Sequence, residues 1–378
     1  MTRHLGYKYR IYPTKEQACT LNQMFGCVRF VYNHYLTERT ENPKLNYYDC
    51  QNDLPSLKEE YPFLKETDSM SLQMAVRALF SAFDKKQKPR YKSKRKHKDS
   101  YTTCFIHNNI AVLDKGHIKL PKLKTVKAKI HRDLPENARI KRATITRTPS
   151  GKYFVSFTIE FESSNEVNVS SSKTGFLGLD YSSPHMYVDS NGNKADMPHY
   201  YRNTLEKLAY EQKILSKKEK GSKRYEKQRI KVAKLQEKAA NQRRDFQHKL
   251  SREIANSYIF VCVEDINMIE YQKDTEEFKL NKATLDNGFG QFRTFLDYKL
   301  TETGGRLLRV NKWFASSKTC HYCGKKNTSL KLTDRVWECD RCHTVHGRDV
   351  NAAINLRNKG VEMMYGTVTQ VGKRYLCG

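Results

Sequence analysis

The chain has 378 residues, a length that usually forms more than one domain. Its 69 lysines and arginines outnumber its 41 acidic residues, so the formal net charge is +28 and a polyanionic partner is expected. No apolar run approaches the roughly 18 residues of a membrane-spanning helix, and the N-terminus lacks a signal-like apolar core. The composition therefore argues against a membrane protein and favours the cytoplasm.

The N-terminal part predicts one strand followed by helices. In residues 6–14, GYKYRIYPT, aromatic and aliphatic residues alternate with Lys and Arg, which is typical of a strand with one exposed basic face. Thr14 and Gln17 have the spacing of a capping box, and apolar residues then recur at three- and four-residue steps. A second helix is predicted over residues 72–83, so residues 14–88 should form a helical lobe.

A strongly basic run, KKQKPRYKSKRKHK, follows this lobe between residues 85 and 98. It holds nine Lys or Arg, while its single proline prevents a continuous helix. A solvated linker is the alternative interpretation of such a run. Because the whole chain is strongly basic, contact of this run with nucleic-acid phosphates is favoured over the linker interpretation. Basic residues of a later helix are predicted to contact phosphates as well. The predicted nucleic-acid contacts are Lys85, Lys86, Lys88, Arg90, Tyr91, Lys92, Lys94, Arg95, Lys96, Lys98, Arg243 and Arg244.

Strand patterns return over residues 101–162, with turns predicted at residues 114–116 and 149–151. A strand, helices and further strands together indicate a β-barrel-like module that the helical lobe interrupts. The polar residues 163–173 are predicted to be a linker, which places a domain boundary near residue 170.

The second half alternates strands and helices. A pair of strands closing at an Asn-Gly turn is predicted first, and then a charged helical segment that breaks at Gly221. Seven-residue apolar spacing in that segment also fits a coiled coil, but the seam is short, so packing within the chain is predicted. The elements in order are two strands in 174–194, helices in 203–257, a strand at 258–264, a helix at 289–303 and a strand at 306–310.

Four of the ten cysteines form two C-x-x-C pairs separated by 15 residues, which is the spacing of a four-cysteine zinc site. Four thiolates fill the tetrahedron of Zn²⁺, so a site made of Cys320, Cys323, Cys339 and Cys342 should be structural. There are two alternatives. A nearby histidine (His321, His343 or His346) could replace one cysteine as a zinc ligand, or one C-x-x-C pair could serve in redox chemistry. The other six, Cys19, Cys27, Cys50, Cys104, Cys262 and Cys377, are predicted to be small buried or half-buried residues.

Three acids stand where predicted elements end or begin. Asp180 follows an apolar strand, Glu264 ends the strand at 258–264, and Asp349 begins a helix. Each by itself is explained by a turn or a helix start. At one edge of a sheet, however, the three together could hold two Mg²⁺ or Mn²⁺ ions about 4 Å apart, which activate a water and stabilise the leaving oxygen of a phosphodiester.

Five segments in order, KYRIYPTKEQ, FGCVRFVYNHYL, GLDYSSPHMYVDSNG, FVCVEDIN and SSKTCHYCG with the following CDRC and HGRDVNAAINL, resemble the TnpB proteins of bacterial insertion sequences. These are RNA-guided DNA nucleases related to type V CRISPR effectors, and the likeness runs from about residue 5 to residue 360. It implies Asp180, Glu264 and Asp349 as Mg²⁺ ligands and catalytic acids of a RuvC-type, RNase H-like domain. It also implies partners: a guide RNA from its own locus and target double-stranded DNA beside a short motif, with one monomer per RNA favoured.

The resemblance implies an α+β multidomain fold in which a zinc module interrupts the nuclease domain. It places the wedge barrel at 1–13 and 89–165, the helical recognition lobe at 14–88, nuclease segments I and II at 174–316, the zinc module at 317–345, nuclease segment III at 346–360 and a C-terminal tail at 361–378. Many relatives have Gly and Asp where this chain has Ser182 and Gly347. The alternatives are a catalytically silent repressor, plain or RNA-guided, which should lack an acid, and a strand-transferring transposase.

Overall fold

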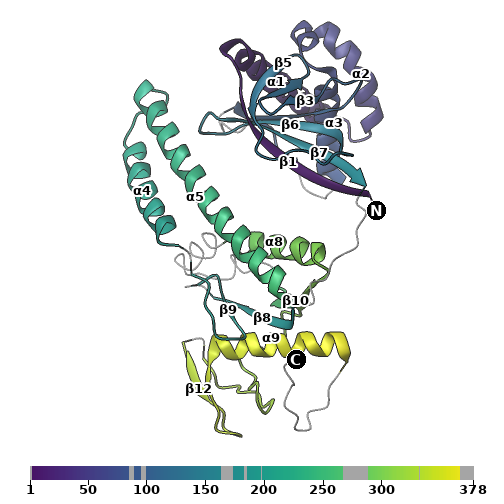
Figure 1. Ribbon diagram of the computed structural model, residues 1–378. Helices are drawn as coiled ribbons and strands as arrows, with labels where there is room; N and C mark the ends of the chain where they lie inside the picture. Colours follow the sequence, from purple (N-terminus) through teal and green to yellow (C-terminus); the bar gives the residue numbers. More distant parts are fainter. Residues whose placement is uncertain are drawn as a thin grey trace. The chain divides into compact units, whose positions relative to one another are not determined.

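The computed structural model describes residues 2–84, 89–94, 99–162, 173–182, 185–196, 198–266, 288–331 and 333–366 (Figure 1). The chain divides into two compact units. The first comprises Met1–Asn165 with Glu219–Lys234, and the second comprises Glu166–Lys218 with Leu235–Gly378. In these described ranges, no helix is long and apolar enough to cross a membrane.

A seven-stranded sheet forms the frame of the first unit, in the order β2-β6-β7-β1-β5-β4-β3. Its central strand β1 (Thr2–Tyr12) is antiparallel to both neighbours, and the alternation predicted from the sequence is confirmed because Tyr7, Tyr9 and Ile11 are buried. The other strands are β2 (Asp99–Cys104), β3 (Ala111–Asp114), β4 (His117–Leu120), β5 (Lys124–Lys129), β6 (Arg139–Arg147) and β7 (Tyr153–Glu162).

The predicted barrel is not observed. In the described part of the first unit, strand pairing leaves β2 and β3 as the two edges of the sheet. A helix, α3 (Ser69–Asp84), packs against β2, so that edge is covered by helical side chains instead of by a closing strand.

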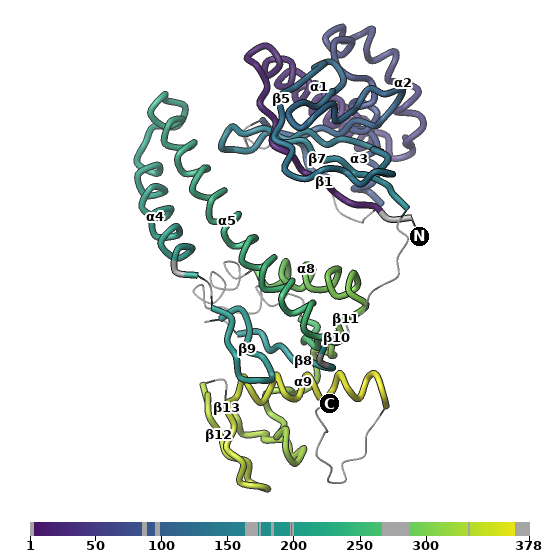
Figure 2. The backbone as a smooth tube through the Cα atoms, in the orientation of Figure 1, coloured from purple at the N-terminus to yellow at the C-terminus, as the bar shows by residue number. Residues whose placement is uncertain are grey.

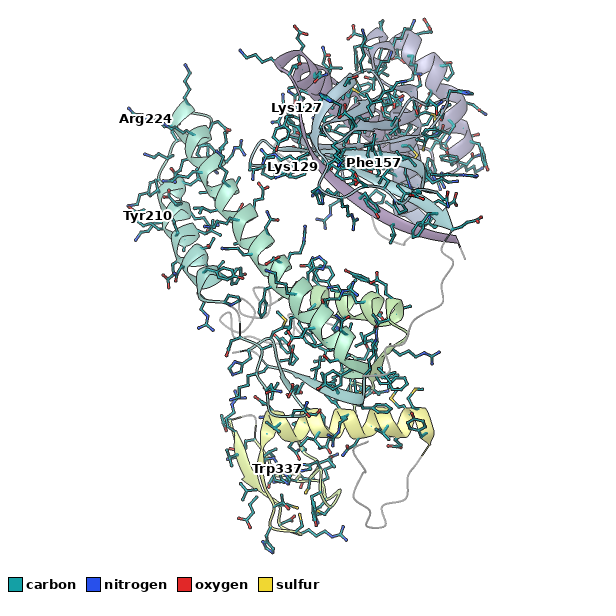
Figure 3. The ribbon with its side chains drawn as sticks, viewed as in Figure 1. Lys127, Lys129, Phe157, Tyr210, Arg224 and Trp337 are labelled. Atoms are coloured by element: carbon teal, nitrogen blue, oxygen red, sulfur yellow. The ribbon has the colours of Figure 1, made fainter. Side chains whose placement is uncertain are left out.

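Helices α1 (Lys15–Glu41), α2 (Tyr47–Glu60) and α3, with the short 3₁₀ helix η1 (Pro62–Glu66), also belong to this unit. The capping box of α1 is confirmed, because the Gln17 backbone N–H donates to the Thr14 hydroxyl and the Thr14 N–H donates to the Gln17 side chain. Helix α2 was not predicted, since Pro55 lies inside it and resembles a helix breaker. Helices and sheet share one core, which includes the fully buried Phe157 labelled in Figure 3.

The second unit has a four-stranded sheet in the order β11-β10-β8-β9. Strand β10 (Tyr258–Glu264) is parallel to both β8 (Thr174–Tyr181) and β11 (Arg306–Val310), whereas β9 (Tyr187–Asp189) is antiparallel to β8. The strands predicted at 258–264 and 306–310 are therefore confirmed. Because β8, β10 and β11 run in the same direction, their carboxyl ends meet at one edge of the sheet.

Helices cover this sheet. The predicted break between α4 (His199–Ser216) and α5 (Lys223–Ser257) is confirmed at Gly221, whose φ is +92°. Helix α8 (Phe289–Glu302) buries Phe292 and Leu296 in the same core as the strands. Helix α9 (Arg348–Tyr365) crosses β8 and β10, as Figure 2 shows.

Candidate active site and cysteine cluster

The three acids lie on neighbouring elements of the second unit. Asp180 is the next-to-last residue of β8, Glu264 is the last residue of β10, and Asp349 is the second residue of α9. The register of the parallel pair aligns Val263 with Leu179, so one further step brings Glu264 beside Asp180. Both strand acids therefore stand at the same carboxyl edge of the sheet.

Two glycines bring α9 against these strands. A Cβ on Gly178 would overlap the carbonyl oxygen of Ala353, and a Cβ on Gly360 would overlap the sulfur of Cys262. Side chains alternate along a strand, so Gly178 faces the same side as Asp180, and Cys262 faces the same side as Glu264. The helix that begins with Asp349 therefore packs on the face of the sheet that carries the other two acids.

Burial and the charges of the other two acids both act on the carboxyl group of Asp180. The pKa of Asp180 is raised well above its ordinary value, first by burial and then by the carboxylates of Asp349 and Glu264, while Arg348 acts in the opposite direction. Burial also raises the pKa of Glu264. Like charges in one partly buried place favour binding of a cation, and carboxylate oxygens are the ligands that Mg²⁺ and Mn²⁺ prefer. The donor set thus fits hard divalent ions.

The three acids are less tightly grouped than the cysteines. Within the described ranges, the only group of three or more His, Cys, Asp or Glu whose ligand atoms all lie within 4.8 Å is a cluster of cysteines. The oxygens of the three acids are thus more widely spread.

Two arginines beside the acids were not anticipated from the sequence. The Arg335 Nη1 atom lies 3.7 Å from Asp349 Oδ1. Arg293 of α8 donates to the carbonyl oxygens of Glu264, at 3.3 Å, and Ile266, at 3.0 Å, and so fixes the chain where β10 ends. Neither belongs to a recognisable motif, and only the packing of α8 and the cysteine module brings them here.

The prediction that Cys320, Cys323, Cys339 and Cys342 come together is confirmed, since their sulfur atoms all lie within 4.8 Å of one another. Their module includes the antiparallel strands β12 (Val336–Glu338) and β13 (Val345–Gly347). Four thiols at this spacing match the donor set of a tetrahedral structural zinc ion. The neighbouring histidines are not part of the cluster, although the Nε2 atom of the buried His346 lies 3.1 Å from Cys320 Sγ.

Buried asparagines connect the cysteine module to α9. Asn351 donates to the carbonyl oxygen of Thr319 at 2.8 Å, and its own side-chain oxygen accepts from the His321 backbone N–H at 3.0 Å. One helical turn later, Asn355 donates to the carbonyl oxygens of Ser316 and Thr319. The module and the helix that carries Asp349 are therefore held together by hydrogen bonds on both sides of Cys320.

Only some of the predicted nucleic-acid contacts lie within the described residues. The ammonium of Lys92 lies 3.7 Å from the centre of the Tyr32 ring, and its backbone bonds to the Asn33 side chain, so residues 89–94 contact α1. Arg90, Tyr91 and Lys94 belong to this stretch, and the α5 residues Arg243 and Arg244 are half-buried and exposed, respectively. Lys85, Lys86, Lys88, Arg95, Lys96 and Lys98 lie outside the described residues.

The remaining cysteines mostly behave as small apolar residues, with one correction. Cys27, Cys50 and Cys262 are buried and Cys104 is half-buried, as predicted. Cys19 is exposed because it lies on the outer side of α1, away from the buried face that begins at Leu21. Cys377 lies outside the described residues.

Replacing Gly178 by alanine should displace α9 from the sheet. The added methyl overlaps the helix backbone at Ala353, and overpacking of this kind costs about 1–3 kcal/mol. The midpoint of urea unfolding should fall, while Gly175→Ala on the same strand, where a methyl meets nothing within 4 Å, should change it little. Equal midpoints for the two variants would show that α9 does not approach β8 this closely.

Fold and site define a mixed α/β protein of two units, in which a four-cysteine module stands between the second and third of three neighbouring acids. Three family models match the chain: "Helix-turn-helix domain" at residues 1–46, "Probable transposase" at 158–275 and "Cas12f1-like, TNB domain" at 289–356. The first of these covers a strand and one helix in this structure.

Relatives match over nearly the whole chain. A Streptomyces pristinaespiralis protein named "Putative RNA-guided DNA endonuclease" is 35% identical, with 94% of this chain and 89% of the relative covered. InsQ of Escherichia coli K12, which carries the same description, is 27% identical, with 99% and 96% covered. The cryo-EM structure of a Cas12f1–sgRNA–target DNA complex shares the fold, with a TM-score of 0.57, 12% identity, and 94% of this chain and 99% of that chain covered. This chain therefore belongs to the TnpB/IS605 transposase family.

Proposed function

We propose that this protein is an RNA-guided DNA endonuclease that cleaves phosphodiester bonds with two divalent metal ions. The observation that carries the proposal is the convergence of three acids, because Asp180 and Glu264 stand at one carboxyl edge of the sheet and α9, which begins with Asp349, packs on the same face. The carboxylates of Glu264 and Asp349 raise the pKa of Asp180, and like charges held this close are costly unless cations offset the repulsion. The names of the two relatives described above support the same activity.

Each acid has its own part in the proposed mechanism. Asp180 interacts with both other carboxylates, so it would hold the metal together with each of them. Glu264 and Asp349 supply further oxygens from β10 and α9. When bound, Mg²⁺ or Mn²⁺ supplies an activated water and stabilises the leaving oxygen of the phosphodiester. Arg335, beside Asp349, adds positive charge where the DNA phosphate must approach.

The remaining parts of the chain are assigned in keeping with this activity. The four-strand sheet with α9 is proposed to be the RNase H-like, RuvC-type nuclease domain, and the cysteine module to bind structural Zn²⁺. The sheet of the first unit with α1 to α3 is proposed to bind guide RNA and to recognise a short motif next to the target. Base pairing would then select the sequence, while the basic protein, at +28, binds phosphates.

One other function has a specific observation in its favour, since residues 158–275 match the model described as "Probable transposase". A transposase could use the same acids for strand transfer. A repressor is less well supported, because none of the three acids is missing.

The test is cleavage by protein that is coexpressed with RNA from its own locus. A plasmid that carries the matching sequence should be cut in Mg²⁺ and left intact in EDTA, and a mismatched plasmid should stay intact. Sequencing of the copurified RNA should give a defined guide. Joined DNA products or cutting without RNA would favour the transposase, and binding without any cutting would favour the repressor.

A further inference from the structure

The side chain of Trp313, in the second unit, is exposed to solvent. Trp313 is 82% exposed, whereas the other tryptophan of the chain, Trp337, is 7% exposed and packs within the cysteine module. Single exposed apolar residues are common on protein surfaces, so exposure alone assigns no role. The surroundings of Trp313 distinguish it.

A rigid turn presents this ring. The Asn311 side chain accepts from the Trp313 backbone N–H at 2.9 Å, and the Asn311 carbonyl oxygen accepts from the Phe314 N–H at 2.9 Å. The next side chain, Phe314, packs inward against the cluster of Cys262, Val310 and Leu356. With Phe314 anchored in the core, the backbone turns Trp313 outward, so its exposure is built into the fold.

The turn follows directly from the strand beside a candidate catalytic acid. Val310, the last residue of β11, pairs with Glu264. Trp313 is three residues further along, and three residues span at most about 11 Å, while neighbouring strands are roughly 5 Å apart. The indole is therefore attached within roughly 16 Å of the Glu264 backbone, at the edge of the sheet where the acids stand.

The charge around this ring fits a polyanion. Residues 303–333 contain seven lysines and arginines (Arg306, Arg309, Lys312, Lys318, Lys325, Lys326 and Lys331) and no acidic residue. The ammonium of Lys312 lies 5.1 Å from the centre of the Trp313 ring. A flat aromatic face beside lysines is the arrangement that binds unpaired nucleotides, because bases stack on the ring while phosphates meet the cations.

We propose that Trp313 is a stacking platform for an unpaired base of single-stranded DNA next to the three acids. This inference rests on the proposed nuclease function, and it adds how the strand is held for cleavage. A duplex keeps its bases stacked internally, so the platform selects strands that have been opened. Lys312 is assigned to a neighbouring phosphate.

Binding can be measured without cleavage. Full-length protein, freed of copurifying nucleic acid in high salt, is titrated in EDTA with a labelled oligo-dT strand. Trp313→Ala should weaken binding at least about fivefold, because stacking contributes ~1–3 kcal/mol per base, and Trp313→Phe should restore most of it. Tyr210→Ala, at a similarly exposed aromatic residue of α4, which is assigned to no nucleic-acid contact, is the matched control and should bind as the unchanged protein does.

Salt dependence separates stacking from charge. Trp313→Ala should leave the slope of log Kd against log salt unchanged, whereas Lys312→Gln should reduce it by about 0.7. Tryptophan emission of the unchanged protein should fall on addition of oligo-dT and stay constant with polyphosphate, which has no bases. In Trp313→Phe only the buried Trp337 emits, so tryptophan emission should stay constant on addition of either oligo-dT or polyphosphate.

Several results would overturn the proposal. Equal affinities of Trp313→Ala and the unchanged protein would exclude stacking, as would equal quenching by single-stranded and duplex DNA. Protection of Trp313 from acrylamide in the free protein would show that another part of the chain covers the ring. Tighter binding of oligo-rU than of oligo-dT would contradict the assignment to DNA. Because every assay omits Mg²⁺ and guide RNA, a failure of the nuclease proposal would not affect these outcomes.

Discussion

Asp180→Asn should abolish DNA cleavage while leaving guide RNA and target DNA bound. Asp180 is the acid that interacts with both other carboxylates, and the amide keeps its shape but removes its charge. Loss of even an outer partner of a metal ligand costs about 10–100-fold in activity, so loss of a residue that would hold the metal directly should exceed that. Plasmid cleavage and a gel-shift assay measure the two properties separately.

Asp297→Asn, at a half-buried acid of α8 that pairs with Arg309, is the matched control and should cut normally. Cleavage at a normal rate by the Asp180 variant would remove this residue from the site. Loss of both cleavage and binding would indicate a folding defect, and a thermal melt of the same sample would reveal it.

The same substitution should stabilise the metal-free protein at neutral pH. The pKa of Asp180 in the folded state lies well above its ordinary value of 3.8, so between these two values the unfolded chain has lost a proton that the folded chain still binds. Stability contributed by this group is therefore present at low pH and is lost as the pH rises through that window. Asparagine does not ionise, so the variant should have the higher Tm at pH 7. Mg²⁺ should raise the Tm of the unchanged protein more than that of the variant.

Cys339→Ser should release zinc and unfold the cysteine module. Each chain is expected to bind one Zn²⁺ through four thiolates, and structural zinc contributes roughly 10–16 kcal/mol in zinc-finger peptides. The hydrogen bonds from Asn351 and Asn355 to the backbone at residues 316–321 would then be lost, so the start of α9 and Asp349 should lose their support. Cleavage should therefore fall, although Cys339 is not one of the three acids.

Elemental analysis of zinc per chain and hydrogen exchange over the module measure these effects. Cys19→Ser, at an exposed cysteine of α1, is the control and should keep both the zinc and the exchange pattern. Unchanged zinc content in Cys339→Ser would refute the four-cysteine site. Loss of zinc without any change in cleavage would show that the module does not support Asp349.

Much of the fold follows from local patterns. Alternation of Tyr7, Tyr9 and Ile11 with basic residues predicts β1, and the Thr14–Gln17 pair predicts the start of α1, because both depend only on neighbouring residues. Helix α2 was missed, although Asn46 and Asp49 form a similar capping box at its start. Its buried face has only three residues, and Pro55 suggests a break, so contacts with the rest of the lobe decide that it is a helix.

The barrel prediction was wrong for a related reason. Strand count and alternation indicate a curved antiparallel sheet, but whether its edges pair depends on what else packs there. In this unit α3 covers the β2 edge. Closure of a sheet is a property of the whole unit, and no short stretch of sequence encodes it.

The sequence by itself determined which residues have the chemistry to bind metals: three acids at element ends, and two cysteine pairs with the correct separation. The tertiary structure alone decided how they meet. Only Gly178 and Gly360 allow α9 so close to β8 and β10, only Asn351 and Asn355 connect that helix to the cysteine module, and only the turn after β11 leaves Trp313 exposed. The physical reason is that ligand types are local properties of the chain, whereas close approach depends on contacts between residues far apart in sequence.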